Sequence, residues 1–537
     1  MPNWRINLIF IFFILFSAVL IGRLVYIQIL QADFYKALAQ GFHHLPKEIQ
    51  VERGEIFLKN GTPLAVNKNF SLVFATPSKV KNIEKTAEIL SEILKLDKNF
   101  VLGALKKETL YSPIKNKLTQ EEISHLKSLN LPGIYLSQER GRYYPQETLA
   151  SQLIGFLDPN YRGQYGLEEY YDMVLKGGSQ GSDLILTIDY TTQFMAEKLL
   201  EKAKENLDIE GGQIIVIDPN SGKIIALANF PNFNPNQYQK YASKGDFGIF
   251  KNRATQDFFE PGSVFKPITF AAALDQEKIT PQTTYIDKGI VEIGGWSIYN
   301  YANRVWGEQT MTNVLEKSIN TGAVFVQKLL PKNIFLDYLT KFGIFEPTGI
   351  DLPETYSENK EFKKGYEINF ATASYGQGIE MSAIQLARAY CPIANGGKLV
   401  RPYLVEKILI DGKIIETQPE ISSPIISQKT SSQLTAMLVS VVENGFAKRA
   451  KIPGYYIAGK TGTAQVSFSA LGIQKPGYSE KTIQTFVGFF PAFSPQFLIL
   501  VKLDNPKTKT AEYSAVPIFH DLAEYIIHYW QIPPDYE

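Results

Sequence analysis

A serine and a lysine that stand three residues apart could form a nucleophile and its base. Ser263 and Lys266 share the segment Glu260-Pro261-Gly262-Ser263-Val264-Phe265-Lys266-Pro267, and on a helical turn this spacing places both side chains on one face. A lysine can accept the serine proton only when its amine is neutral, which requires desolvation or a neighbouring cation. The apolar residues 268–274 provide a desolvating environment. We therefore predict that Ser263 is the nucleophile and Lys266 its general base.

The proline after this lysine indicates where the pair lies in its helix. Pro267 is compatible with the first turn of a helix but not with its interior. We therefore expect Ser263 in the opening turn, where backbone N–H groups and the helix dipole favour negative charge. The spacing recurs in three other pairs: Ser78/Lys81, Ser124/Lys127 and Ser357/Lys360. These lie in strongly charged stretches, where a solvated lysine stays protonated.

Two further clusters contain side chains that would assist the pair. Ser318-Ile319-Asn320 offers a second hydroxyl that can relay a proton and an asparagine that can hold a substrate amide. Lys460-Thr461-Gly462-Thr463 offers a fixed positive charge on an expected strand, and Gly462 leaves room for a peptide to pair along it. Ser-x-Asn recurs at Ser128/Asn130 and Ser357/Asn359, whereas Lys-Thr-Gly occurs once. The order of the three clusters along the chain is therefore more specific than any one of them.

A second serine lies in a pattern that another class of hydrolase uses. Gly177-Gly178-Ser179-Gln180-Gly181 matches the G-x-S-x-G turn of α/β-hydrolases, which needs a strand before it and a helix after it. Here a helix-like segment, 168–175, precedes the turn and a strand-like run, 184–188, follows it. We interpret the segment as a glycine-rich turn between domains.

The composition argues against several other function classes. The 537 residues, 45% hydrophobic and 20% charged, suffice for two or more domains. A formal net charge of +1 without a concentrated basic surface gives no reason to expect nucleic-acid binding. The one cysteine, Cys391, lies in an apolar run and fits a small buried hydrophobe. No two of the five histidines stand at the i, i+4 spacing with an acidic neighbour that zinc hydrolases use, so we expect neither a metal nor a cofactor.

The N-terminal segment has the length and composition of a membrane-spanning helix. Residues 6–22 carry no charge, and the apolar pattern continues through residues 24–30. Arg23 lies near one end, where its side chain can reach the interface. Arg5 and the terminal amine favour a cytoplasmic N-terminus, which places the rest of the chain outside the membrane. A cleaved signal peptide with Ala37-Leu38-Ala39 as its cleavage site is the alternative, but charged residues separate that site from the apolar run.

The remaining sequence predicts an α+β protein. We expect three parts: a cytoplasmic tip and anchor at 1–30, a non-catalytic module of mixed α/β character at 31–185, and a catalytic domain at 186–537 with an antiparallel sheet and flanking helices. Strands are expected at 184–188, as a hairpin over 212–228, and at 485–490 and 497–503. Helices are expected at 82–96, 265–274, 381–390 and 518–529, and a turn at Lys59-Asn60-Gly61.

The chain resembles a class B penicillin-binding protein over nearly its whole length. Its three clusters, at Ser263, Ser318 and Lys460, match the signature of penicillin-recognising serine enzymes. Five further segments are similar to family motifs: Arg53-Gly54-Glu55-Ile56, Asn60-Gly61-Thr62-Pro63-Leu64-Ala65, Arg142-Tyr143-Tyr144-Pro145, Gly166-Leu167-Glu168 and Leu186-Thr187-Ile188-Asp189. The short anchor, Tyr375-Gly376-Gln377-Gly378 and residues 486–491 most resemble the division-type, septal branch, with the elongation branch as the alternative.

This resemblance implies a peptidoglycan D,D-transpeptidase with a penicillin-binding, serine β-lactamase-like domain. Ser263 would attack the D-Ala-D-Ala bond of one stem peptide, and an amine of a second would release the acyl-enzyme. Lys266 would be the general base and Ser318 the proton relay, with Asn320 and Lys460 supporting them.

The resemblance also assigns the substrate-binding strand and the partners. Thr461 and Thr463 would contact the substrate carboxylate, and the backbone N–H groups of Ser263 and Thr463 would form the oxyanion hole. β-Lactams would be inhibitors, and the enzyme would be a single-pass protein of the cytoplasmic membrane. No glycosyltransferase module fits before residue 185, so a membrane glycosyltransferase and division-machinery proteins would be partners.

Some residues depart from the family pattern, and rival functions share the chemistry. Leu58 and Lys59 stand where an acidic residue and an arginine are usual, and Phe446 replaces a common threonine. A β-lactamase or D,D-carboxypeptidase would use the same residues, but no Glu-x-x-Leu-Asn segment lies between Ser318 and Lys460. A non-enzymatic scaffold of the cell-wall machinery is the other alternative.

Overall fold

The computed structural model describes residues 4–32, 35–36, 53–179 and 181–537. The chain divides into two units, Met1–Glu52 with Asn67–Tyr143 and Arg53–Val66 with Tyr144–Glu537. Strand β2 (Pro63–Ala75) runs from the second unit into the first. The domain boundary expected at residue 185 stays a prediction.

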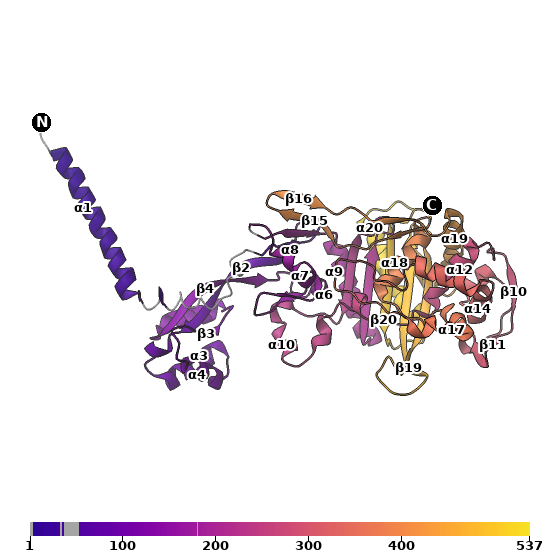
Figure 1. Ribbon diagram of the computed structural model, residues 1–537, viewed down its shortest axis with the longest axis horizontal. Helices are drawn as coiled ribbons and strands as arrows, with labels where there is room; N and C mark the ends of the chain where they lie inside the picture. Colours follow the sequence, from indigo (N-terminus) through magenta and orange to yellow (C-terminus); the bar gives the residue numbers. More distant parts are fainter. Residues whose placement is uncertain (1–3, 33–34, 37–52, 180) are drawn as a thin grey trace. The chain divides into compact units, whose positions relative to one another are not determined.

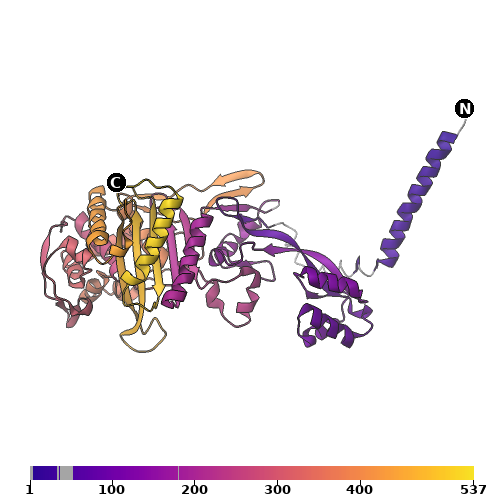
Figure 2. The same ribbon diagram turned by 180° about the vertical axis from the view of Figure 1, so that it is seen from behind.

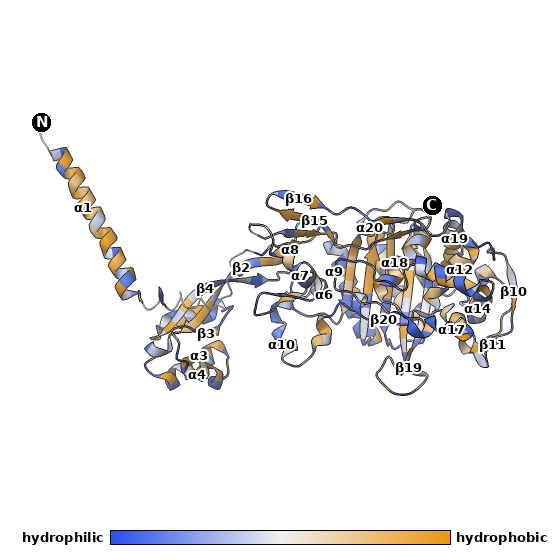
Figure 3. Ribbon diagram, in the orientation of Figure 1, coloured by the Kyte–Doolittle hydropathy of each residue, from blue (hydrophilic) through white to orange (hydrophobic). Residues whose placement is uncertain are grey.

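The N-terminal segment forms the predicted helix. Helix α1 (Trp4–Val25) continues into a π-helical turn (Tyr26–Leu30), and Figure 3 shows it apolar along most of its length. Within the described residues, Trp4–Ile29 is the one helix long and apolar enough to cross a membrane, and none of its side chains is buried. The structure thus has the apolar helix that a single anchor requires. The alternative cleavage site, Ala37-Leu38-Ala39, lies outside the described residues.

The rest of the smaller unit packs helices against short strands. Helix α3 (Ile83–Leu94) confirms the helix predicted over 82–96, and Asn82 caps its N-terminus by accepting a hydrogen bond from the Lys85 N–H at 3.1 Å. Its buried side chains share a core with β2 and its neighbours. The other elements of this unit are α4 (Lys98–Leu105), β3 (Ser112–Lys115), α5 (Gln120–Leu129) and β4 (Ile134–Tyr143).

The larger unit begins with a small mixed sheet. Strand β1 (Ile56–Phe57) pairs antiparallel with the start of β2 across the predicted turn, where Gly61 has φ +83° and the side-chain Oδ1 of Asn60 accepts the Thr62 N–H at 3.0 Å. On its other side β1 pairs parallel with β7 (Asp183–Leu186), which pairs in turn with the hairpin of β15 (Val405–Ile410) and β16 (Lys413–Glu416). Three short helices lie beside these strands in sequence: α6 (Ser151–Ile154), α7 (Gly166–Tyr170) and α8 (Asp172–Leu175).

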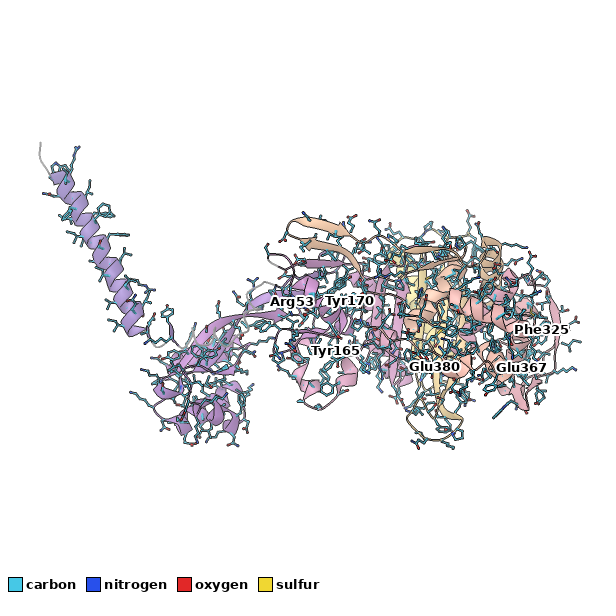
Figure 4. The ribbon with its side chains drawn as sticks, in the orientation of Figure 1. Arg53, Tyr165, Tyr170, Phe325, Glu367 and Glu380 are labelled. Atoms are coloured by element: carbon cyan, nitrogen blue, oxygen red, sulfur yellow. The ribbon has the colours of Figure 1, made fainter. Side chains whose placement is uncertain are left out.

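A buried ion pair holds the first residue of this unit. Arg53, labelled in Figure 4, donates to the Glu168 carboxylate at 2.7 Å and to the Asp172 carboxylate at 2.7 Å. The Glu168 side chain is 0% exposed and that of Arg53 is 8% exposed. Removing the arginine would therefore leave a carboxylate without its counter-ion in a dry environment.

We expect Arg53→Ala to lower the free energy of unfolding by about 3 kcal/mol, because the buried Glu168 carboxylate would lose its partner. Thermal unfolding of the full chain in detergent measures the effect. Lys341→Ala is the control, since the Lys341–Asp337 pair is about half exposed on both sides and should leave the melting temperature nearly unchanged. Equal melting temperatures for the two variants would contradict the importance of the buried pair.

A five-stranded antiparallel sheet forms the centre of the larger unit. Its order is β18-β19-β20-β8-β9, so β18 is an edge strand. Strands β8 (Gly211–Ile217) and β9 (Ile224–Phe230) confirm the predicted hairpin, and β20 (Phe497–Asp504) confirms the strand at 497–503. Strand β18 (Ala458–Ser467) carries the Lys-Thr-Gly segment, and β19 (Tyr478–Phe490) begins earlier than predicted because its polar first half still pairs with β18.

Helices cover both faces of this sheet (Figures 1 and 2). On one face lie α9 (Tyr190–Leu207) and α20 (Ala515–Tyr529), the second being the predicted C-terminal helix. On the other lie α12 (Lys266–Asp275), α18 (Ala383–Ala394) and α19 (Gln428–Asn444). The predicted helices at 265–274 and 381–390 are therefore confirmed, and so is the α+β class.

The remaining elements of the larger unit are short. They are the helices α10 (Gln239–Ala242), α11 (Arg253–Gln256), α13 (Met311–Glu316), α14 (Asn320–Lys328), α15 (Lys332–Lys341), α16 (Lys360–Lys363) and α17 (Glu367–Ala373). The short strand pairs are β5–β6 (Phe156–Leu157, Gly163–Gln164), β10–β13 (Thr284–Asp287, Gly307–Thr310), β11–β12 (Ile290–Ile293, Trp296–Tyr299) and β14–β17 (Lys398–Val400, Ile421–Pro424). Most are too short to leave a periodic pattern in the sequence.

Candidate active site

The candidate nucleophile lies at the start of a buried helix. Ser263 belongs to a 3-10 turn (Gly262–Phe265) that leads directly into α12, whose first residue is Lys266. Pro267 occupies the first turn, as its fixed φ requires. The Lys266 side chain is 0% exposed, and its Nζ lies 2.9 Å from the Ser263 Oγ. The structure thus brings the two groups within hydrogen-bonding distance.

Distant parts of the chain hold the turn that carries Ser263. The Gly262 N–H donates to the Gly376 carbonyl at 2.9 Å, and the buried Tyr390 hydroxyl donates to the Val264 carbonyl. Gly376 has φ +81°, and a Cβ at this position would stand 2.2 Å from the Gly262 carbonyl oxygen. Only glycine fits such an approach. The sequence drew attention to residues 374–378 but did not predict that they support the nucleophile.

The contacts of the Lys266 amine determine where its lone pair points. Besides Ser263 Oγ, its Nζ lies 2.7 Å from the Ser318 carbonyl oxygen and 2.9 Å from the Asn320 Oδ1. Both of these oxygens can only accept, so they take two N–H groups. In a neutral amine the lone pair then remains for the Ser263 hydroxyl, which donates to it. The geometry is that of a base beside its proton donor.

Burial and charge both favour the neutral form of the Lys266 amine. Burial of the whole side chain, and then the nearby Lys460 ammonium, lower the pKa of Lys266 well below its usual 10.5. Burial also lowers the pKa of Lys460, to about 7. Because two nearby ammonium groups repel each other, a protonated Lys460 disfavours protonation of Lys266.

Ser318 lies in a turn between α13 and α14. Ser318 and Ile319, together with Asn320 at the first position of α14, are called here the relay turn, and Ser318 adopts a left-handed conformation with φ +54°. Such a conformation costs a serine about 1 kcal/mol or more. In this conformation the Ser318 carbonyl oxygen lies 2.7 Å from the Lys266 Nζ. Two hydrogen bonds brace the turn: the Thr321 hydroxyl donates to the buried Asp287 carboxylate at 2.6 Å, and the Asn320 amide donates to the Tyr299 carbonyl at 3.1 Å.

The edge strand β18 closes the site. The Lys460 Nζ donates to the Ser318 Oγ at 2.9 Å and lies 3.4 Å from the Thr461 Oγ1. A Cβ on Gly462 would stand 2.9 Å from the Pro261 carbonyl oxygen, so the bare backbone of β18 packs directly on the nucleophile turn. The Thr463 hydroxyl accepts the Ala511 N–H at 3.1 Å and keeps its own proton free to donate.

The Ser318 hydroxyl connects the two lysines. Its Oγ lies 3.2 Å from the Lys266 Nζ and 2.9 Å from the Lys460 Nζ. A proton can therefore pass between Lys266 and a substrate nitrogen through this hydroxyl while Lys460 fixes its orientation. All eight residues singled out from the sequence lie on the 3-10 turn with α12, on the relay turn or on β18.

A carboxylate near the nucleophile was missed. Glu260 accepts the Gly378 N–H at 3.0 Å and the Tyr478 hydroxyl at 3.0 Å, and so joins the 376–378 loop to the start of β19. Burial, opposed in part by these hydrogen bonds, raises the pKa of Glu260 to about 7. Its position three residues before Ser263 was the only indication that the sequence offered.

The competing motifs have structural explanations. Ser179 lies between α8 and β7, and its hydroxyl donates to Asp411 at 2.7 Å, so the interpretation of this segment as a turn is confirmed. In the other Ser-x-x-Lys pairs the lysines Lys81, Lys127 and Lys360 are exposed, as predicted. Cys391 is fully buried, and burial raises the pKa of its thiol. Among the described residues, which exclude His43 and His44, no three metal-ligating side chains gather.

Comparison with known families gives two matches that together span most of the chain. Residues 212–524 match the family described as Penicillin binding protein transpeptidase domain. Residues 48–187 match the family described as Penicillin-binding Protein dimerisation domain. The first match contains every residue of the site described above.

Individual proteins are similar over nearly the full length. Stage V sporulation protein D of Bacillus subtilis is 30% identical, covering 94% of this chain and 82% of its own. The probable peptidoglycan D,D-transpeptidase PbpC of Pseudomonas aeruginosa is 31% identical, covering 99% and 96%. Among solved structures, penicillin binding protein 3 from Mycobacterium tuberculosis in complex with aztreonam has a TM-score of 0.71 and 26% identity, covering 90% of this chain and 97% of that one.

Proposed function

This chain belongs to the penicillin-binding protein transpeptidase family, and from that membership we propose that it cross-links peptidoglycan stem peptides through an acyl-enzyme on Ser263. It is a serine acyltransferase of the D,D-transpeptidase type. One observation carries the assignment of roles: a fully buried lysine amine with a lowered pKa lies 2.9 Å from the Ser263 hydroxyl. That amine is the base that an unactivated serine needs.

In the proposed acylation, Lys266 takes the Ser263 proton as the Oγ bonds to the carbonyl carbon of the D-Ala-D-Ala peptide bond. The backbone N–H groups of Ser263 and Thr463 stabilise the oxyanion. The proton then passes from Lys266 through the Ser318 hydroxyl to the nitrogen of the terminal D-Ala, and the C–N bond breaks. The products are free D-Ala and an ester on Ser263.

Deacylation is proposed to follow the reverse route with a different amine. An amine of a second stem peptide attacks the ester carbonyl and gives its proton through Ser318 to Lys266. Lys266 returns that proton to the Ser263 Oγ as the ester bond breaks. A new peptide bond forms and the enzyme is regenerated.

Substrate binding is proposed along the edge strand. Because β18 lies at the edge of its sheet, a donor peptide could add to it as a further strand beside Gly462. Thr461 and Thr463 would then donate to the terminal carboxylate of the donor, with Asn320 on an amide and Lys460 supplying positive charge. Such main-chain pairing would fix the scissile carbonyl over Ser263.

The cellular setting is part of the same proposal. We place the single N-terminal helix in the cytoplasmic membrane, with the N-terminus inside and the catalytic domain outside. We also propose that the anchor, the non-catalytic module and the catalytic domain span 1–30, 31–185 and 186–537. A septal role, sensitivity to penicillin, and partnership with a membrane glycosyltransferase and division proteins are proposed from the resemblance to the division-type branch. The Mycobacterium tuberculosis neighbour with bound aztreonam supports the β-lactam part.

A fluorescent penicillin tests the proposal on the full chain in detergent. We expect a covalent label on the one tryptic peptide that contains Ser263, persisting for minutes, and no label on the Ser263→Ala variant. Incubation with a D-Ala-D-Ala-terminated peptide and excess D-amino acid should yield the exchanged peptide rather than only the hydrolysed one. Rapid release of the label would indicate a β-lactamase, hydrolysis alone a carboxypeptidase, and absence of labelling a scaffold.

A further inference from the structure

An arginine near the relay turn contacts two aromatic rings and forms no ion pair with any residue that the structure describes. The Arg304 guanidinium carbon lies 5.8 Å from the ring centroid of Trp306 and 5.8 Å from that of Phe446. Arg304 is exposed, whereas both rings are half-buried. Within the part of the chain that the structure describes, no Asp or Glu forms an ion pair with it. Contacts with aromatic rings restrict the conformations of a guanidinium group but leave its N–H groups available at the edge. Such a side chain therefore loses little further conformational entropy when it binds an anion.

A second cation shares the same indole. The Lys317 Nζ lies 5.0 Å from the Trp306 ring centroid and donates to the Gln309 Oε1 at 2.7 Å. Lys317 likewise has no acidic partner among the described residues. Two cations that contact one ring without an ion pair among the described residues can both attract an anion, although the Asp287 carboxylate accepts the Trp306 backbone N–H at 2.8 Å. We call Arg304, Trp306, Lys317 and Phe446 the rim cluster.

The rim cluster is attached to both sides of the relay turn. On one side, the Phe446 N–H donates to the Glu316 carbonyl at 3.2 Å. On the other, the Asn300 amide donates to the Arg304 carbonyl at 3.0 Å and accepts the Thr321 N–H at 3.1 Å. The backbones of Arg304 and Phe446 are therefore linked to residues on the two sides of the relay turn, which contacts Lys266 and Lys460.

We propose that Arg304 binds a carboxylate of the donor stem peptide, upstream of the scissile bond. This inference rests on the transpeptidase function proposed above. An extended peptide advances about 3.3–3.6 Å per residue, so groups one or two residues upstream stay beside the relay turn. Stem peptides can carry free carboxylates there, on a γ-linked D-glutamate or on a diaminopimelate. A guanidinium holds a carboxylate through two parallel N–H···O bonds, a geometry that lysine cannot form.

Matched donor peptides test the proposal. Ala-γ-D-Glu-Lys-D-Ala-D-Ala and its D-isoglutamine amide differ only in the charge on the second residue. A second pair, with diaminopimelate and with its amidated form, differs only at the third. We expect the wild-type kcat/KM to favour the charged member of one pair by about tenfold or more, mainly through KM, because a remote group binds ground and transition states alike. The pair that shows the preference identifies the carboxylate.

Variants separate recognition from support of the fold. In Arg304→Ala the ratio of kcat/KM for the charged peptide to that for the amidated peptide should fall to about one, because only the value for the charged peptide decreases. In Arg304→Lys part of this preference should remain. Arg449→Ala is the matched control, since Arg449 is also exposed and its guanidinium carbon lies 4.8 Å from the Tyr513 ring centroid. It should keep the wild-type preference. Added salt should weaken the preference in the wild type, because the contact is exposed.

Labelling by fluorescent penicillin keeps the two proposals distinguishable. If the wild type labels at Ser263 but shows no preference in either pair, the carboxylate site is wrong and the proposed function stands. If Arg304→Ala slows both members of a pair equally, the residue supports the relay turn and the recognition role is also wrong. If the wild type does not label at all, the proposed function itself fails.

Discussion

Lys266→Met is expected to slow the acylation of Ser263 by about a thousandfold, because it removes the general base while filling nearly the same volume. The Lys266 Nζ is the nitrogen within 3 Å of the Ser263 Oγ, and no other base contacts that hydroxyl among the described residues. The rate of covalent labelling by a fluorescent penicillin, measured at several concentrations, gives the second-order constant directly.

Lys360→Met is the matched control for this loss. Lys360 follows Ser357 at the same spacing, but its side chain is 81% exposed. Its replacement should leave the acylation rate unchanged. An equal loss in both variants, or a rate in Lys266→Met within a few-fold of the wild type, would contradict the role of Lys266 as base. Melting temperatures of both variants show whether the fold is retained.

The pH dependence of the wild type follows from the same lysine. An amine is a base only in its neutral form, so acylation should rise as pH increases through the pKa of Lys266. Since burial and Lys460 lower that pKa well below 10.5, the rise should be complete at a pH far below that of an ordinary lysine. A rate that kept rising up to pH 10 would indicate a solvated lysine and a different base.

Gly462→Ala is expected to reduce acylation by about a hundredfold with the fold retained, because it displaces the edge strand from the nucleophile turn. A Cβ at this position would stand 2.9 Å from the Pro261 carbonyl oxygen and 3.2 Å from the Val264 backbone nitrogen. Neither backbone atom can turn aside as a flexible side chain would. A shift of a few tenths of an ångström or more would move Thr463 relative to Ser263 and enlarge the proposed oxyanion hole.

Gly248→Ala is the control, since a Cβ there meets no atom within 4 Å and the residue has no positive φ. It should acylate as fast as the wild type. Gly462 also has no positive φ, so its replacement tests space rather than backbone strain. A wild-type rate in Gly462→Ala would show that β18 tolerates displacement and that the oxyanion hole is formed elsewhere.

Features that depend on near neighbours in the chain were predictable. The N-terminal helix is a long apolar run, the 212–228 hairpin is two short apolar runs around a turn, and the C-terminal helix is amphipathic. Each is present. Pro267 located the start of the nucleophile helix because proline restricts its own backbone wherever it stands. The polar first half of β19 was missed, because its pairing with β18 leaves no apolar alternation to detect.

The assembly of the site from three separate clusters was also predictable, but the lowered pKa of its lysine was not. Ser-x-x-Lys, Ser-x-Asn and Lys-Thr-Gly name the reacting groups, yet the same spacing at Ser357/Lys360 gives an exposed lysine. What distinguishes Lys266 is complete burial together with a second ammonium on β18. Desolvation and Coulomb interaction act through space and depend on which chain segments pack together.

The residue types and their order along the chain thus indicate which chemistry this protein can perform. A hydroxyl, an amine and a glycine without a side chain have the same chemical character in any fold. Folding alone lowers the pKa of the Lys266 amine, turns the Ser318 carbonyl toward it and sets Gly376 against Gly262. These contacts join residues far apart in sequence, where local propensity carries no information and only close packing decides the distance.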